Sequence, residues 1–94
     1  MVVLIQGVDG RSPFDAARVS RSVRRVLSAA PDGAQRADCV LGAVTTQLQR
    51  WEFMRGGAVM HADELQDIVE AAFFACGDLT GLRSYIIARF ELGK

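Results

Sequence analysis

The chain has 94 residues, of which half are hydrophobic and 23% are charged, a composition typical of one folded domain rather than a disordered chain. Its 11 basic and 11 acidic residues cancel to a formal net charge of zero, which argues against a protein held to nucleic acid by bulk charge. No stretch approaches the ~20 consecutive apolar residues that a membrane-spanning helix needs, so we expect no membrane partner.

A short β-hairpin is the first structure expected along the chain. Residues 2–5 (Val-Val-Leu-Ile) are apolar and mostly β-branched, which predicts a strand, and Asp9-Gly10 is a strong turn signal. The chain then returns through Arg11-Ser12. Pro13, which has no backbone donor, is expected to end this second strand. A short apolar run at 58–60 is expected to add a third small strand.

Four helices are expected from apolar periodicity and from their start and stop signals. Asp15 is suited to cap the first of them, because its carboxylate can accept from free backbone N–H groups. The predicted helices span residues 15–30, 35–51, 63–76 and 79–92. The sequence thus predicts a single domain over residues 1–94, mostly α in an α+β fold, with a four-helix bundle-like core capped by a small two- or three-stranded β-sheet. The positions expected to be most buried are Val23, Leu27, Leu65, Ile68, Val69, Phe73 and Ile86.

The residue types that most enzymes and metal sites need are scarce. Cys39 and Cys76 form no CxxC pair and fall on apolar helix stripes, so we expect buried free thiols in a reduced, cytoplasmic protein rather than a disulfide. One histidine, His61, and two distant cysteines do not make a zinc site. No nucleophile, phosphate-loop or dinucleotide-binding motif is present. We therefore expect a protein that is not an enzyme.

Three segments resemble the ATP-cone, a nucleotide-sensing regulatory domain of ribonucleotide reductases and related proteins. Residues 5–19 read IQGVDGRSPFDAARV and are similar to the family's opening V-x-K-R-D-G-R-x-x-P-F-D-x-x-K-I. Residues 65–70 (LQDIVE) resemble its I-Q-D-x-V-E, and residues 85–89 (YIIAR) resemble the end of its A-x-x-Y-I-x-x-R helix. The matches follow the family's order and span nearly all of the chain.

The resemblance implies an allosteric regulatory module that binds ATP or dATP beneath the β cap, with Mg²⁺ accompanying the nucleotide and no other cofactor. It also implies control of a ribonucleotide reductase or similar enzyme subunit through subunit assembly, with no nucleic-acid partner. The positions that match the family's nucleotide-binding residues are Gly10, Arg11, Phe14, Arg18, Gln66 and Arg89.

The chain departs from the family where a Lys-Arg pair meets the nucleotide phosphates, because Gly7 and Val8 occupy these positions. Losing two charge-assisted hydrogen bonds weakens binding by several kcal/mol, about 100-fold or more. The alternative is therefore a degenerate cone that no longer binds nucleotide and serves in protein interaction or self-association through Trp51, Phe53 and Met54. A nucleic-acid adaptor that uses an arginine-rich first helix is a third hypothesis, which the zero net charge disfavours.

Overall fold

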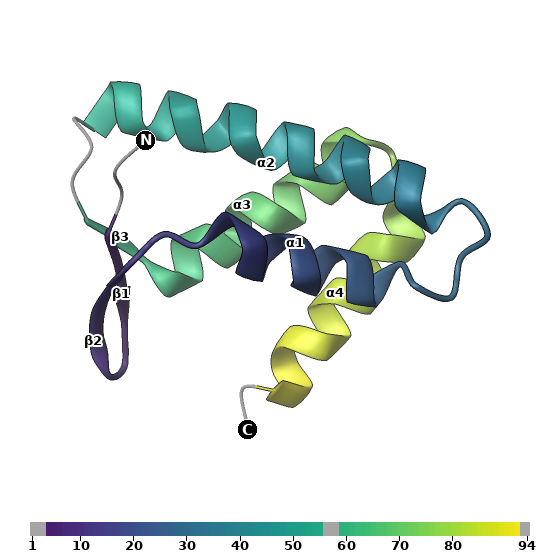
Figure 1. The fold of residues 1–94 in the computed structure, drawn as a ribbon, viewed down its shortest axis with the longest axis horizontal. Coiled ribbons are helices and arrows are strands. Elements are labelled where there is room, and N and C mark those ends of the chain that lie inside the picture. Colours follow the sequence, from purple (N-terminus) through teal and green to yellow (C-terminus); the bar gives the residue numbers. More distant parts are fainter. Residues whose placement is uncertain (1–3, 56–58, 93–94) are drawn as a thin grey trace.

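A computed structural model describes the chain at residues 4–55 and 59–92, where four helices enclose a core beside a small mixed β-sheet (Figure 1). The predicted mostly α, α+β architecture is confirmed. The elements in order are β1 (Leu4–Gly7), β2 (Gly10–Pro13), α1 (Ala16–Val26), α2 (Gly33–Arg55), β3 (Val59–His61), α3 (Ala62–Ala75) and α4 (Leu79–Leu92). Within these residues no helix is both long and apolar enough to cross a membrane.

The sheet has the strand order β2-β1-β3, with β1 antiparallel to β2 and parallel to β3. Gly7 pairs with Gly10 and closes the hairpin, and Gly10 has a φ of 116°, a left-handed value that favours glycine. The turn therefore forms where Asp9-Gly10 predicted it. Residues 2 and 3 of the predicted first strand, and residue 58 of the predicted third, lie outside the described residues.

The helix boundaries differ from the predicted ones around the α1–α2 connection. Asp15 caps α1 as predicted, since its carboxylate accepts from the backbone N–H groups of Ala17 and Arg18 at 3.0 and 3.3 Å. However, α1 ends at Val26 rather than at residue 30. The helix is already left at Leu27, whose φ of −97° and ψ of 4° are not helical, and Pro31 disfavours helical backbone only at Ala30.

Helix α2 is longer than predicted, and it spans the length of the molecule (Figure 1). The sequence predicted residues 35–51, with Gly42 and Thr45-Thr46 as weak points. In the structure the two threonine hydroxyls donate to the carbonyls four residues earlier, at 3.0 and 3.1 Å, and the helix continues to Arg55.

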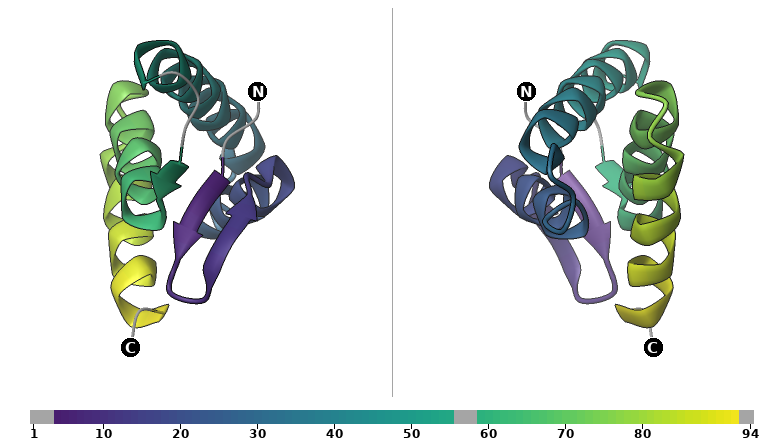
Figure 2. Two further views of the ribbon diagram at one scale, coloured as in Figure 1. Left: turned by 90° about the vertical axis from the view of Figure 1, so that its left-hand side faces the viewer. Right: turned by 90° about the vertical axis from the view of Figure 1, so that its right-hand side faces the viewer.

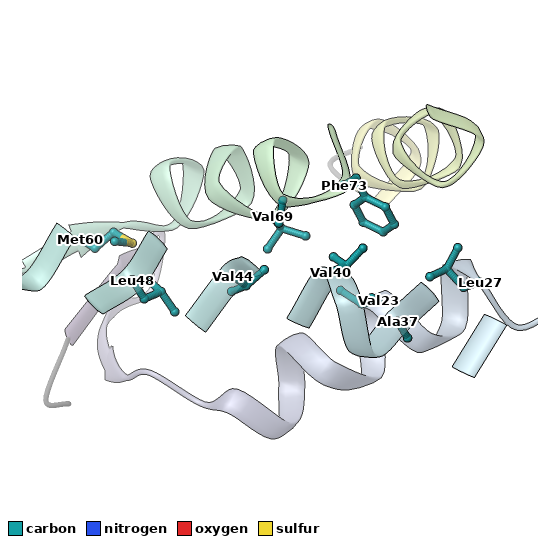
Figure 3. Packing of buried hydrophobic residues seen from close by; sticks show 10 residues of the cluster. Val23, Leu27, Ala37, Val40, Val44, Leu48, Met60, Val69 and Phe73 are labelled. Carbon is teal, nitrogen blue, oxygen red and sulfur yellow. The ribbon is translucent and has the colours of Figure 1, made fainter. Parts of the chain in front are cut away.

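The core lies where α2 packs against α1 and α3 (Figure 3). One face of α2 runs through it at spacings of three and four residues, and Met60 brings the sheet against one end. Its ten buried residues are Val23, Leu27, Ala37, Val40, Val44, Leu48, Met60, Val69, Ala72 and Phe73. Burial was thus predicted correctly for Val23, Leu27, Val69 and Phe73, but Leu65, Ile68 and Ile86 are only partly buried.

A disulfide and an ion pair join the beginning of α2 to the connection between α3 and α4. Cys39 and Cys76 form the disulfide, with a Cα–Cα distance of 6.4 Å, so the prediction of two buried free thiols was wrong. Cys39 is on the exposed side of α2, and because the two cysteines are bonded to each other they do not indicate a reducing compartment.

The ion pair lies one helical turn from the disulfide. Arg36 donates to both carboxylate oxygens of Asp78, from Nε at 2.9 Å and from Nη2 at 2.5 Å. Asp78 also accepts from the backbone N–H of Gly81 at 2.9 Å and so helps to begin α4. The hydrogen bond from Arg36 lowers the pKa of Asp78, because it stabilises the carboxylate form.

Candidate anion-binding site

Helix α1 presents arginines on its exposed side and valines to the core. Arg18, Arg21 and Arg25 are spaced by three and four residues and therefore share one face of the helix. Val23, on the other side, is fully buried. The burial of Val23 fixes the rotation of α1 about its own axis. The face that carries the three arginines therefore points to solvent.

These side chains line a hollow of about 450 Å³, whose described lining consists of Arg18, Arg21, Ser22 and Arg25. The Ser22 hydroxyl donates to the carbonyl of Arg18 at 3.2 Å, so its oxygen remains free to accept. The three arginines extend over about 10 Å along the helix axis, at a rise of about 1.5 Å per residue. The hollow thus offers several cationic donors to one elongated ligand.

The arginines of the hollow have no carboxylate partner among the residues that the structure describes. Arg24 differs, because it pairs with Asp38 of α2 at 2.9 Å and also donates to the hydroxyl of Ser20. Helix α1 contains four arginines and no acidic residue, and among the side chains that the structure describes only Arg24 has a carboxylate partner. Guanidinium groups bind phosphate and carboxylate oxygens through paired N–H donors, which makes the uncompensated face a candidate anion-binding site.

The hairpin holds two of the residues suggested by the resemblance, Gly10 and Arg11. The Arg11 guanidinium donates from Nε to Oε1 of Gln6 at 3.0 Å, across the strand pair. Gly10 serves the turn through its positive φ. Val8, where the family has a cation, is fully exposed at the tip, and the turn carries only the negative charge of Asp9. The hairpin tip therefore supplies no cation to a phosphate.

Phe14, the next of these residues, lies between β2 and α1 and packs against the edge of the core. Its ring is partly buried, which leaves it a structural role at the start of α1.

Gln66 belongs to α3 and Arg89 to α4, two helices that Figure 2 shows on the other side of the β-hairpin from α1. Arg89 pairs with Asp67 at 3.2 Å, with Asp63 at 3.7 Å, and with Glu70. Burial lowers the pKa of Arg89, but the hydrogen bond to Asp67 and the charge of Glu70 outweigh this effect and raise it. The arginine is thus engaged by carboxylates within the fold.

Of the six residues suggested by the resemblance, only Arg18 lines the hollow. Helix α1 packs against α2 and α4, whereas no Cα atom of α3, which carries Gln66, lies within 8 Å of a Cα atom of α1. The sequence did contain a signal for the missed residues, since Arg21 and Arg25 repeat at helical spacing from Arg18. A solvated helix face has the same spacing, so the pattern alone did not identify a site.

Comparison with known proteins does not assign the chain to a family. No protein-family model matches it, and no curated protein matches it either. The case for a function therefore rests on the chain's own residues and on their arrangement.

Proposed function

We propose that the chain is an allosteric regulatory module that binds the phosphates of a nucleotide effector, ATP or dATP, on the arginine face of α1. The observation that carries this proposal is the set of three guanidinium groups, without a described carboxylate partner, that lines one hollow. The resemblance to the ATP-cone adds the expected output, which is control of a ribonucleotide reductase or similar enzyme subunit through subunit assembly. Mg²⁺ is expected to arrive with the nucleotide.

Electrostatics supports phosphate as the ligand but sets a limit on affinity. A triphosphate carries about four negative charges, and charge-assisted hydrogen bonds to it are stronger than neutral ones. Arg18, Arg21 and Arg25 are exposed, however, so water and salt screen each interaction to about 1 kcal/mol or less. The hairpin tip adds no cation. We therefore expect a Kd weaker than about 100 µM at physiological salt.

Isothermal titration calorimetry with ATP and dATP tests this function, and Arg24 offers a matched control. The variants Arg18→Ala, Arg21→Ala and Arg25→Ala each remove one guanidinium from the hollow, whereas Arg24→Ala removes one that is already paired with Asp38. We expect weaker binding in the first three variants and unchanged binding in the fourth. An absence of heat and of any chemical-shift change at millimolar nucleotide would exclude the function.

A second candidate function is docking to a protein, as in a degenerate cone that no longer binds nucleotide. Its support is an apolar pair at the end of α2, where Phe53 is 87% exposed and Met54 is 78% exposed. Trp51, expected in the same cluster, is only half-buried and donates from Nε1 to Glu64 at 3.3 Å, with the Arg55 guanidinium 6.0 Å from its ring centroid. The exposed apolar surface at this end of α2 is thus limited to Phe53 and Met54 and is smaller than the three-residue cluster expected from the sequence.

Sedimentation at increasing concentration separates this candidate from the first. If the apolar pair mediates self-association, wild type should form dimers or larger species, and Phe53→Ser/Met54→Ser should stay monomeric. A wild-type chain that remains monomeric at millimolar concentration would remove self-association as a function. If the wild type binds no nucleotide but Gly7→Lys/Val8→Arg does, the chain is a cone that has lost only the cations that bind phosphate.

A further inference from the structure

We infer that the hollow on α1 selects its ligand by the number of linked phosphates and does not select the base. The inference rests on the proposed function, because it concerns the same arginines. It adds a ligand class to that proposal, namely linear polyphosphates with or without a nucleoside. The described lining of the hollow, Arg18, Arg21, Ser22 and Arg25, is its starting point.

The arrangement of the arginines favours a chain of phosphates over a single phosphate. The guanidinium groups follow one helix face over about 10 Å and are separated by roughly one turn each. A lone phosphate reaches one or two of them, while a triphosphate lying along the face can reach all three. Each further phosphate adds an ion pair with another arginine. Because the phosphates are linked, binding the second and third costs little additional translational entropy of the ligand. Affinity is therefore expected to rise with phosphate number.

The described lining has no group suited to distinguish one base from another. Proteins read a base through hydrogen bonds to its edges, which need fixed donors and acceptors, and through stacking on aromatic rings. Arginine donors can read O6 and N7 of guanine, but a triphosphate along the helix face engages all three guanidinium groups. Stacking on arginine accepts any base, because every base has a π-face. Ser22 is held by its bond to the carbonyl of Arg18 and offers only its oxygen. Nothing in this described set prefers adenine to guanine.

The residues that could read a base are not among the described residues that line the hollow. Gln66 belongs to α3, and no Cα atom of α3 lies within 8 Å of a Cα atom of α1. Phe14 packs against the core edge, and Arg89 is engaged by Asp67 and Glu70. In Figure 2 the β-hairpin lies between α1 and the α3–α4 pair, so the arginine helix and the two helices that carry Gln66 and Arg89 are on separate sides of the hairpin. A nucleotide held by α1 is therefore held by its phosphates.

Separate titrations with four ligands test the inference. The chain is titrated with ATP, GTP, inorganic tripolyphosphate and AMP, without Mg²⁺, at low and at physiological salt. We expect ATP, GTP and tripolyphosphate to agree within about threefold and AMP to bind at least about tenfold more weakly. Raising the salt should weaken the three polyphosphates in parallel.

The possible failures are distinguishable. Binding of ATP more than about tenfold tighter than both GTP and tripolyphosphate would overturn the inference and leave the nucleotide function standing. AMP that binds as tightly as ATP would also overturn it. No binding by any of the four would overturn the inference and the proposed function together. As a further check, Arg25→Ala should weaken tripolyphosphate more than AMP, and Arg24→Ala should change neither.

Discussion

Breaking the bond between Cys39 and Cys76 is expected to destabilise the protein mainly through its unfolded state. The two cysteines are separated by 37 residues. In the chain-entropy description a closed loop of this length restricts the unfolded chain by about 4 kcal/mol at 25 °C. For a domain of roughly this size, such a loss corresponds to a Tm lower by roughly 15–30 °C.

The native structure gives a reason to expect little additional loss in the folded state. Arg36 and Asp78 join the same two parts of the chain, and their hydrogen bonds do not depend on the sulfur atoms. The connection between α2 and α4 should therefore survive reduction. The effect then appears as a shift in stability rather than as a change of fold, and far-ultraviolet circular dichroism should be almost unchanged below the transition.

The assay is urea unfolding of wild type with and without a phosphine reductant, beside Cys39→Ser/Cys76→Ser. Mass spectrometry first establishes that the untreated chain lacks two hydrogen atoms relative to the reduced chain. We expect reduction to lower the midpoint of wild type and to leave the double variant unchanged. An untreated chain with two free thiols, or equal midpoints in the two conditions, would refute the reasoning.

Further substitutions test the packing and the ion pair. Phe73→Ala should cost about 3–5 kcal/mol in urea unfolding because the ring is fully buried, and Phe74→Ala, at 68% exposure, should cost little; equal costs would show that the core has been misplaced. Gly81→Ala should destabilise by about 1–3 kcal/mol, since its Cβ would lie 2.8 Å from Cε1 of Phe73 and 2.9 Å from Cγ of Asp78. Gly42→Ala, on the open surface of α2, should instead stabilise the protein by up to about 1 kcal/mol. The Tm should therefore fall for Gly81→Ala and rise for Gly42→Ala, and the opposite sign in either would contradict the prediction. Because folding lowers the pKa of Asp78 below its unfolded value of about 4, its ion pair contributes fully above that pH and is lost as the pH falls through the folded pKa. The difference in unfolding free energy between wild type and Asp78→Asn should shrink below about pH 4, and a constant difference would contradict this.

Local signals were enough to predict much of the fold. The carboxylate of Asp15 caps α1 through neighbouring N–H groups, and the turn at Gly10 depends on its own backbone freedom, so both could be recognised from adjacent residues. The apolar period of α3 placed Val69 and Phe73 correctly in the core. The full length of α2 could not be predicted in this way: the predicted helix included Gly42, but the structure extends it at both ends, from residue 35 back to Gly33 and from residue 51 on to Arg55.

The partners of charged and sulfur-containing side chains were harder to predict. Cys39 meets Cys76, and Arg36 meets Asp78, only because α2 and α3 pack together, and no local pattern encodes this meeting. Arg89 falls on a nucleotide-binding position of a resembling family, yet three carboxylates of α3 surround it. Sequence gives the type of charge at a position, while its availability to a ligand depends on neighbours brought in by the fold.

The separation of charge between α1 and α3 gives this neutral chain an electric dipole. Helix α1 carries four arginines and no acid, and α3 carries four carboxylates and neither lysine nor arginine. Figure 2 shows the two helices on opposite sides of the hairpin. Beyond about one Debye length, roughly 8 Å at physiological salt, the molecule presents almost no field. Within that distance an electrostatic torque turns α1 toward an anionic surface before contact. Salt should therefore change the orientation in which the protein meets such a surface more than it changes how often they meet.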